Sequence, residues 1–120
     1  MTEWKGAQYI DLTFGVNDQT SSGASFGPGI VPVALETPAG WTQADVSIEV
    51  DVSDDGSGDW RRVFGGGADY TEYGVAPNKR LYWDPKAVAH LIDGKPLRLF
   101  SSVGQANAVT VRLRGAWQTL

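Results

Sequence analysis

Residues 45–64 constrain the fold of this chain more than any other stretch. Aliphatic and polar side chains alternate there without interruption, in the order Val46, Ser47, Ile48, Glu49, Val50, Asp51 and Val52. Because neighbouring side chains of a β-strand point to opposite faces, this pattern predicts a strand with one aliphatic face and one charged face. An Asp- and Gly-rich turn follows at residues 53–58, and residues that favour strands resume at Trp60. We therefore predict a β-hairpin over residues 45–64.

Shorter period-two patterns recur along the chain. They fall at residues 9–14, 30–36, 60–64, 68–73, 79–83, 96–102 and 109–114. The 15 glycines and 6 prolines among 120 residues favour short strands that are joined by turns. A chain of this length can bury roughly two-thirds of its unfolded surface as one domain. We therefore predict an all-β fold, a single-domain antiparallel β-sandwich (jelly roll) of about eight strands that spans residues 1–120.

Four segments lie outside these patterns. Residues 15–29 are polar and rich in Gly and Ser, which predicts a long surface loop with room for one ragged edge strand. Residues 84–94 begin with Asp-Pro, end with Gly and carry apolar residues three and four positions apart, which predicts one short helix. Residues 1–8 and 116–120 flank the alternating segments, and we predict that they form terminal arms.

The two predicted arms each carry a tryptophan, Trp4 and Trp117. A large ring near a chain end is difficult to bury within one domain, and tryptophan is enriched at the centres of protein interfaces. We therefore predict that Trp4 and Trp117 belong to an interface with another copy of the chain or with a partner.

The two halves of the chain carry opposite charge. Residues 1–60 contain ten acidic side chains and one basic side chain, for a net charge of −9, whereas residues 61–120 contain four acidic and nine basic side chains, for a net charge of +5. One interpretation is that strands of the two halves interleave, so that charges neutralise each other across strand pairs. The alternative is a dipolar molecule that docks onto its own copies or onto an asymmetric partner.

The sequence contains no signature of a catalytic or metal centre. It lacks cysteine, and His90 is its single histidine, so neither a thiolate site nor a multi-histidine metal site can form. Residues 51–62 begin like an EF-hand calcium loop, but its twelfth position, which should be Glu, is Arg62. A shallow calcium site of two carboxylates is the alternative at this turn. We predict no catalytic residue, no metal site and no cofactor, and we therefore predict that the chain is not an enzyme.

Charge and hydropathy restrict the partners further. A net charge of −4 argues against a nucleic-acid partner, because phosphate binding depends on Lys and Arg. No apolar run approaches the roughly 18 residues of a membrane-spanning helix, and the first residues do not resemble a secretion signal. We predict a soluble, unprocessed chain without a membrane partner.

Aromatic residues leave carbohydrate as an alternative ligand. Rings that stack on sugar faces could come from any of six residues: Trp41, Trp60, Tyr70, Tyr73, Tyr82 and Trp83. Aromatic rings more often pack within a core or sheet, which is the competing interpretation for each of them.

Several motifs resemble known β-sandwich proteins. Residues 53–60, Ser-Asp-Asp-Gly-Ser-Gly-Asp-Trp, are similar to the strand-turn-strand of discoidin-like, galactose-binding-type jelly rolls, and the segments 97–99 and 109–115 are similar to their closing strands. The order of motifs more closely resembles a group of small virion proteins of tailed bacteriophages. The similarity rests on Ile10-Asp11-Leu12-Thr13, Trp41-Thr42-Gln43-Ala44-Asp45, the hairpin, Asp84-Pro85, Leu97-Arg98-Leu99 and the segment from Gln105 to Val111.

This resemblance implies a structural role. It implies a head-decoration (cement) protein that binds the major capsid protein and itself, most simply as a homotrimer, on the capsid surface of a virion assembled in the host cytoplasm. The alternatives are a carbohydrate-binding adhesion module and a tail or neck accessory protein of the same particle. The sugar-binding loops of the discoidin-like proteins have no recognisable counterpart here, so the resemblance assigns no ligand-binding residue.

Overall fold

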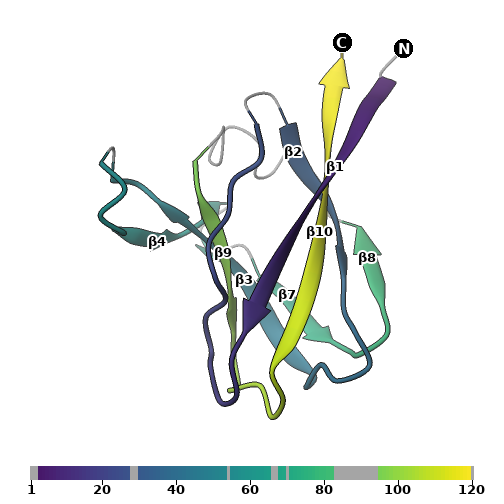
Figure 1. The fold of residues 1–120 in the computed structure, drawn as a ribbon, viewed down its shortest axis with the longest axis vertical. Coiled ribbons are helices and arrows are strands. Elements are labelled where there is room, and N and C mark those ends of the chain that lie inside the picture. The colour runs from purple at the N-terminus through teal and green to yellow at the C-terminus, as the bar shows by residue number, and fades with distance from the viewer. Residues whose placement is uncertain are drawn as a thin grey trace.

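A computed structural model of the protein describes residues 3–27, 30–53, 55–65, 68–69, 71–82 and 95–119. These residues form an all-β structure (Figure 1). They include no helix long and apolar enough to cross a membrane. The short helix predicted at residues 84–94 lies outside the described residues. The strands are β1 (Glu3–Phe14), β2 (Ile30–Glu36), β3 (Ala44–Asp51), β4 (Trp60–Arg62), β5 (Phe64–Gly65), β6 (Ala68–Asp69), β7 (Thr71–Val75), β8 (Arg80–Tyr82), β9 (Leu97–Ser101) and β10 (Val109–Thr119).

Two antiparallel sheets build the body of the molecule, an arrangement consistent with a β-sandwich. The first sheet has the order β1-β10-β2-β8. In the second sheet β3 is central, with β9 on one side and both β4 and β7 on the other. β4 pairs with the end of β3 and β7 with its beginning, while β5 and β6 pair with each other between them. Two of the ten strands among the described residues are therefore a small extra hairpin, which accounts for the difference from the predicted eight.

The core lies between the two sheets and contains the inward side chains of the predicted alternating segments. Leu12 and Phe14 of β1, Leu113 of β10, Ile48 of β3 and Leu99 of β9 are each no more than 1% exposed. The hairpin predicted at residues 45–64 is confirmed, because Asp51 is paired with Trp60 and Glu49 with Arg62. The period-two pattern thus correctly predicts which side chains face inward.

Charges of the two halves of the chain interleave, as the first interpretation of the charge distribution predicted. In the first sheet, strands from the acidic half (β1, β2) alternate with strands from the basic half (β10, β8). The Arg112 Nε donates to the Asp11 carboxylate at 3.0 Å across the β1–β10 pair, and the Arg98 Nε donates to Glu49 at 2.8 Å across β9–β3. Acidic and basic side chains therefore lie side by side across these strand pairs and are not separated onto two halves of the molecule.

The described part of the predicted loop, residues 15–27, lies along the edge of β9. Ala24 and Leu97 exchange two backbone hydrogen bonds of 3.0 and 2.8 Å, as neighbouring strands do. The Phe26 side chain is only 3% exposed. The segment is thus the ragged edge strand that the sequence allowed. Its polar, Gly-rich composition did not predict that Phe26 would be buried in the core.

The predicted terminal arms differ from the structure, in which both continue regular strands. Residues 3–8 belong to β1, residues 116–119 belong to β10, and Glu3 is paired with Thr119. The two ends of the chain therefore lie side by side at one end of the molecule (Figure 1).

Replacing Gly115 with alanine should destabilise the fold by about 1–3 kcal/mol, because the buried site has no room for a methyl group. A Cβ at this position would lie 2.6 Å from Phe26 Cε1 and 2.7 Å from Ile30 Cγ2, both core side chains. Chemical denaturation would measure the loss. Gly27→Ala is the matched control, because its Cβ would meet nothing nearer than Ile30 Cδ1 at 3.7 Å. Equal unfolding free energies for the two variants would contradict the prediction.

Candidate functional site

The outer face of the second sheet carries five side chains in a continuous arginine–aromatic stack: Trp60, Arg98, Glu49, Arg62 and Phe100. The Arg98 guanidinium carbon lies 4.5 Å from the Trp60 ring centroid, and that of Arg62 lies 4.1 Å from the Phe100 ring centroid. Between the two arginines, the Glu49 carboxylate accepts a hydrogen bond from Arg98 at 2.8 Å and lies 3.7 Å from Arg62. The stack therefore has an aromatic ring at each end and three charged side chains between them, across three strands.

The strand register positions these side chains. Glu49 of β3 is opposite Arg62 of β4 on one side and Arg98 of β9 on the other. Trp60 and Phe100 lie two residues away on the same strands as the arginines, so period-two alternation places them on the same face. The ring of Trp60 also lies against Gly23, where a Cβ would be 2.8 Å from the ring.

Glu49 organises the electrostatics of the stack. Its side chain is only 12% exposed, and an isolated carboxylate at such a site would lose much of its hydration. The two arginines compensate for this loss, and each guanidinium is in turn held against an aromatic face. The stack thus presents Arg and aromatic groups in a fixed arrangement, which lowers the conformational entropy that a partner would have to remove on binding.

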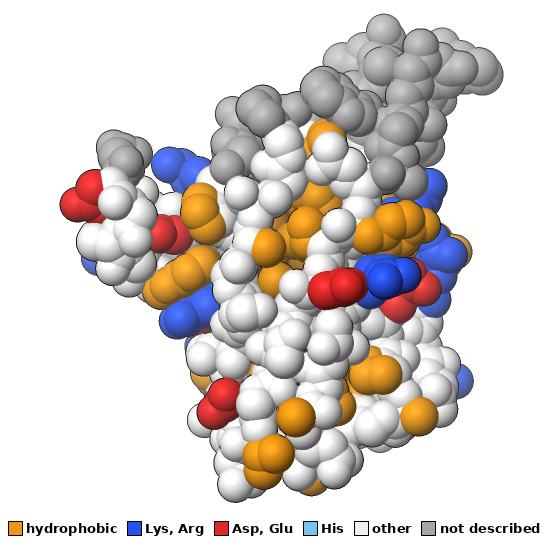
Figure 2. Space-filling view, viewed as in Figure 1, with side chains coloured by type: hydrophobic (Ala, Val, Ile, Leu, Met, Phe, Trp, Pro, Cys, Tyr) orange, Lys and Arg blue, Asp and Glu red, His pale blue; other side chains and the backbone are white. Residues whose placement is uncertain are grey.

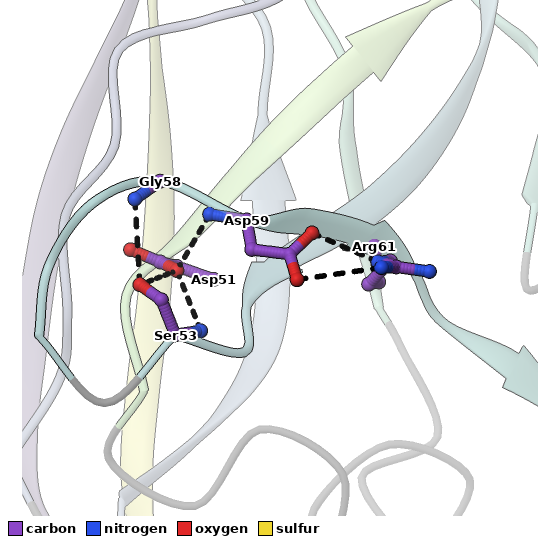
Figure 3. Close-up of polar contacts among 5 residues, drawn as sticks. All are labelled: Asp51, Ser53, Gly58, Asp59 and Arg61. Atoms are coloured by element: carbon purple, nitrogen blue, oxygen red, sulfur yellow. Dashed lines mark hydrogen bonds and ion pairs between the residues drawn. The ribbon is translucent and has the colours of Figure 1, made fainter.

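The turn between β3 and β4 forms its own hydrogen-bond network (Figure 3). One oxygen of Asp51 accepts from the Ser53 hydroxyl at 2.6 Å, the Ser53 N–H at 2.9 Å and the Asp59 N–H at 3.1 Å. The Asp59 carboxylate accepts from Arg61, with Nε at 2.9 Å. The turn is therefore closed by its own aspartates, which hold backbone N–H groups across the loop.

These hydrogen bonds lower carboxyl pKa values in the turn. The pKa of Asp51 lies below its ordinary value, chiefly because the Ser53 hydroxyl donates to the carboxylate, with desolvation opposing the effect. The pKa of Asp55 is lowered mainly by the hydrogen bonds from Ser57. Within the part of the chain that the structure describes, no group of three or more His, Cys, Asp or Glu side chains could hold a metal ion.

Lowering the pH should destabilise the protein partly through Asp51. Because its folded-state pKa is depressed, its contribution is complete above the unfolded-state pKa, near 3.8, and is lost as the pH falls through the lower folded-state value. In Asp51→Asn this contribution is absent, so the free energy of unfolding should depend less steeply on pH in that acidic range. Urea titrations at a series of acidic pH values would measure both slopes. Parallel curves for the two proteins would contradict the prediction.

The structure brings the chain-end residues predicted for an interface to neighbouring positions. Trp4 is paired with Gln118, and Trp117 with Lys5, so the two tryptophans are one register step apart on adjacent strands. Their side chains lie outside what the structure describes. The prediction that they form an interface therefore stays a prediction.

The other five aromatic residues that could stack on a sugar fall into three groups. Trp41 is 3% exposed and belongs to the core, which is incompatible with a role as a sugar platform in this fold. Tyr73 and Tyr82 are 78% and 70% exposed. Tyr70, Trp83 and His90 lie outside the described residues.

A hollow of about 340 Å³ is lined by residues of β7, β8 and the turn that connects them. Its lining includes Tyr73, Lys79 and Arg80. The Arg80 guanidinium carbon lies 5.4 Å from the centroid of the Tyr82 ring, which is not part of the lining. The hollow combines an accessible ring with two basic residues and one acidic residue, Glu72.

Sequence reasoning missed the arginine–aromatic stack. Its members lie on three strands, and only the register between those strands brings them together. The sequence does contain one signal for the stack. Trp60 and Arg62 are two residues apart, as are Arg98 and Phe100, and this spacing places a ring and a cation on the same face of each strand.

No protein-family model matches the chain, and a search of curated proteins finds no significant match.

Proposed function

We propose that this chain is a non-enzymatic structural protein of a bacteriophage particle, a jelly-roll decoration (cement) protein that binds the coat lattice on the capsid surface. The observation that carries the proposal is the arginine–aromatic stack, whose side chains are held in a fixed arrangement on the outer face of the second sheet. The motif resemblance described above selects the virion as the setting. A tail or neck position in the same particle would use the same surface.

The stack has the residue types that dominate binding energy in protein interfaces. Trp and Arg are enriched among such residues, and both are present here beside a partly shielded ion pair. A capsid repeats the same coat subunit many times, so a decoration protein that contacts several subunits gains avidity from individually weak contacts. A rigid sheet face suits this task because little order has to be gained on binding.

The capsid proposal is tested by co-sedimentation of the purified chain with capsids assembled from the coat protein encoded nearest to its gene. We expect saturable binding, and we expect Arg62→Ala to weaken it at least tenfold. Arg98 still neutralises Glu49 in that variant, so the fold should persist. Arg61→Ala is the matched control, because it removes the same charge from the adjacent position on β4, where Arg61 pairs with Asp59. Absence of binding, or equal binding by both variants, would refute the proposal.

The hollow between β7 and β8 supports a second candidate function, a carbohydrate-binding module. An exposed tyrosine can stack on the apolar face of a sugar. Lys79 and Arg80 outnumber Glu72 in the lining, which favours a sugar that carries a carboxylate or sulfate. A glycan array that includes acidic and neutral sugars would test this. Retained signal in Tyr73→Ala, or no signal for the unmodified chain, would eliminate this candidate.

A further inference from the structure

Four charged residues form a row across the outer face of the first sheet. Strand pairing places Asp11 of β1 opposite Arg112 of β10, Arg112 opposite Glu36 of β2, and Glu36 opposite Arg80 of β8. We call these residues the charge row. The charges read minus, plus, minus, plus from one edge of the sheet to the other. Figure 2 shows acidic and basic side chains side by side on the viewed face.

The next row on the same face ends in a tyrosine at each edge. Tyr9 is opposite Arg114, Arg114 is opposite Ala34, and Ala34 is opposite Tyr82. The two tyrosines are 50% and 70% exposed. Each of them has a guanidinium from the charge row over its ring, that of Arg112 at 5.3 Å from Tyr9 and that of Arg80 at 5.4 Å from Tyr82.

This pattern is complementary to itself under one symmetry operation. A two-fold axis that runs parallel to the strands, between β10 and β2, turns a second copy face to face and exchanges the ends of each row. Asp11 then faces Arg80 of the second copy, and Arg112 faces Glu36 of the second copy. Tyr9 faces Tyr82 of the second copy. All four charges of the row meet an opposite charge, and each tyrosine meets a tyrosine.

We propose that two copies of the chain associate through the outer faces of their first sheets about this two-fold axis. The inference does not depend on the capsid proposal, which uses the other sheet. It differs from the three-fold assembly that the resemblance implies, because only a two-fold axis places the same face of two copies against each other. We name a second copy of the chain as the partner because the charge row, read in reverse order, presents an opposite charge at every position.

The contact should be weak and sensitive to salt. Four strands about 4.8 Å apart present a face on the order of 20 Å wide, so the buried area falls at or below the low end of specific interfaces, about 1,200 Å² in total. A hollow of about 290 Å³ that Asp11, Glu36 and Thr110 help to line opens beside the charge row and would hold water in the pair. Exposed charge pairs also weaken as added salt screens them.

Analytical ultracentrifugation over a wide concentration series tests the pairing. At low salt and high concentration, the molar mass should rise from the 12.9 kDa of one chain to twice that value, and added salt should reverse the rise. Arg80→Asp should abolish the rise, because it faces Asp11 of the second copy with a like charge. The double variant Asp11→Arg/Arg80→Asp restores opposite charges across the axis and should recover the association. Arg61→Asp, the same charge change on the other sheet, should leave it unaffected.

Other outcomes would overturn the inference. A single-chain mass at every concentration would mean that this face is left open or is covered by a different partner. A three-chain mass would indicate another symmetry. Pairing that survives Arg80→Asp, or that the double variant fails to recover, would place the contact elsewhere. Thermal melting of each variant confirms that the chain is folded when its mass is measured.

Discussion

Replacing Gln105 with alanine is expected to lower the free energy of unfolding by about 3 kcal/mol, a large part of the roughly 5–15 kcal/mol that stabilises a typical domain. The Gln105 side chain is fully buried. Its Oε1 accepts from the Thr42 N–H at 2.8 Å, and its Nε2 donates to the Thr42 carbonyl and the Ser101 hydroxyl, each at 3.1 Å. Alanine would leave the Thr42 N–H, the Thr42 carbonyl and the Ser101 hydroxyl without this buried partner. Urea denaturation monitored by tryptophan fluorescence would measure the loss.

Two further variants test whether the loss of stability in Gln105→Ala comes from its buried hydrogen bonds. Asn107→Ala removes one exposed hydrogen bond, from Nδ2 to the Gly40 carbonyl at 3.2 Å, and should cost less than about 1 kcal/mol. Gln105→Glu keeps the size of the side chain but, when ionised, cannot donate to the Thr42 carbonyl. It should therefore also be destabilising at neutral pH. An Ala variant at position 105 that is as stable as Asn107→Ala would show that the buried network contributes nothing.

Replacing Trp41 with alanine is expected to cost about 3–5 kcal/mol, the range for large aromatic residues removed from a core. The ring packs edge-on against Phe14, with centroids 5.4 Å apart, and its Nε1 donates to the Val75 carbonyl at 2.9 Å. The residue thus joins the inner faces of β1 and β7. Loss of the ring would create a cavity and leave a buried carbonyl without its donor. Thermal and chemical unfolding would both report the change.

The contribution of the indole N–H can be measured separately. Trp41→Phe keeps a ring against Phe14 but removes the donor to Val75, so we expect an intermediate loss of about 1–3 kcal/mol. Tyr73→Ala is the control for removal of an aromatic ring, because Tyr73 is 78% exposed and should change stability by no more than about 0.5 kcal/mol. Equal stability of Trp41→Ala and Tyr73→Ala would contradict the packing described here.

Alternation in the sequence predicts the faces of the strands well. Val46, Ile48 and Val50 face the core as their spacing requires, and the turn between β3 and β4 forms where Asp and Gly cluster. Period two determines a face because each residue step turns the side chain to the other side of the strand. It contains no information about which strand will lie beside which.

Apart from the β3–β4 hairpin, strand partners and the candidate site therefore could not be predicted. The pairing of β1 with β10 joins the two ends of the chain, and β4 and β7 share one edge of β3 across an inserted hairpin. The arginine–aromatic stack exists only because this pairing brings Glu49 between Arg62 and Arg98. Gln105 begins the motif that runs to Val111, so the sequence drew attention to it. Its hydrogen bonds could not be predicted, because they depend on Thr42, which is distant in the sequence.

The pairing of β1 with β10 has a consequence for how the protein is made. As the ribosome releases the chain from its N-terminus, β1 emerges first and has no neighbour in its sheet until β10 has also emerged. The second sheet, whose last strand is β9, can therefore assemble before the first sheet is complete. Contacts between such distant segments also slow folding, to roughly the millisecond-to-second range for all-β domains. The nascent chain thus exposes a strand edge of β1 until β10 has emerged from the ribosome.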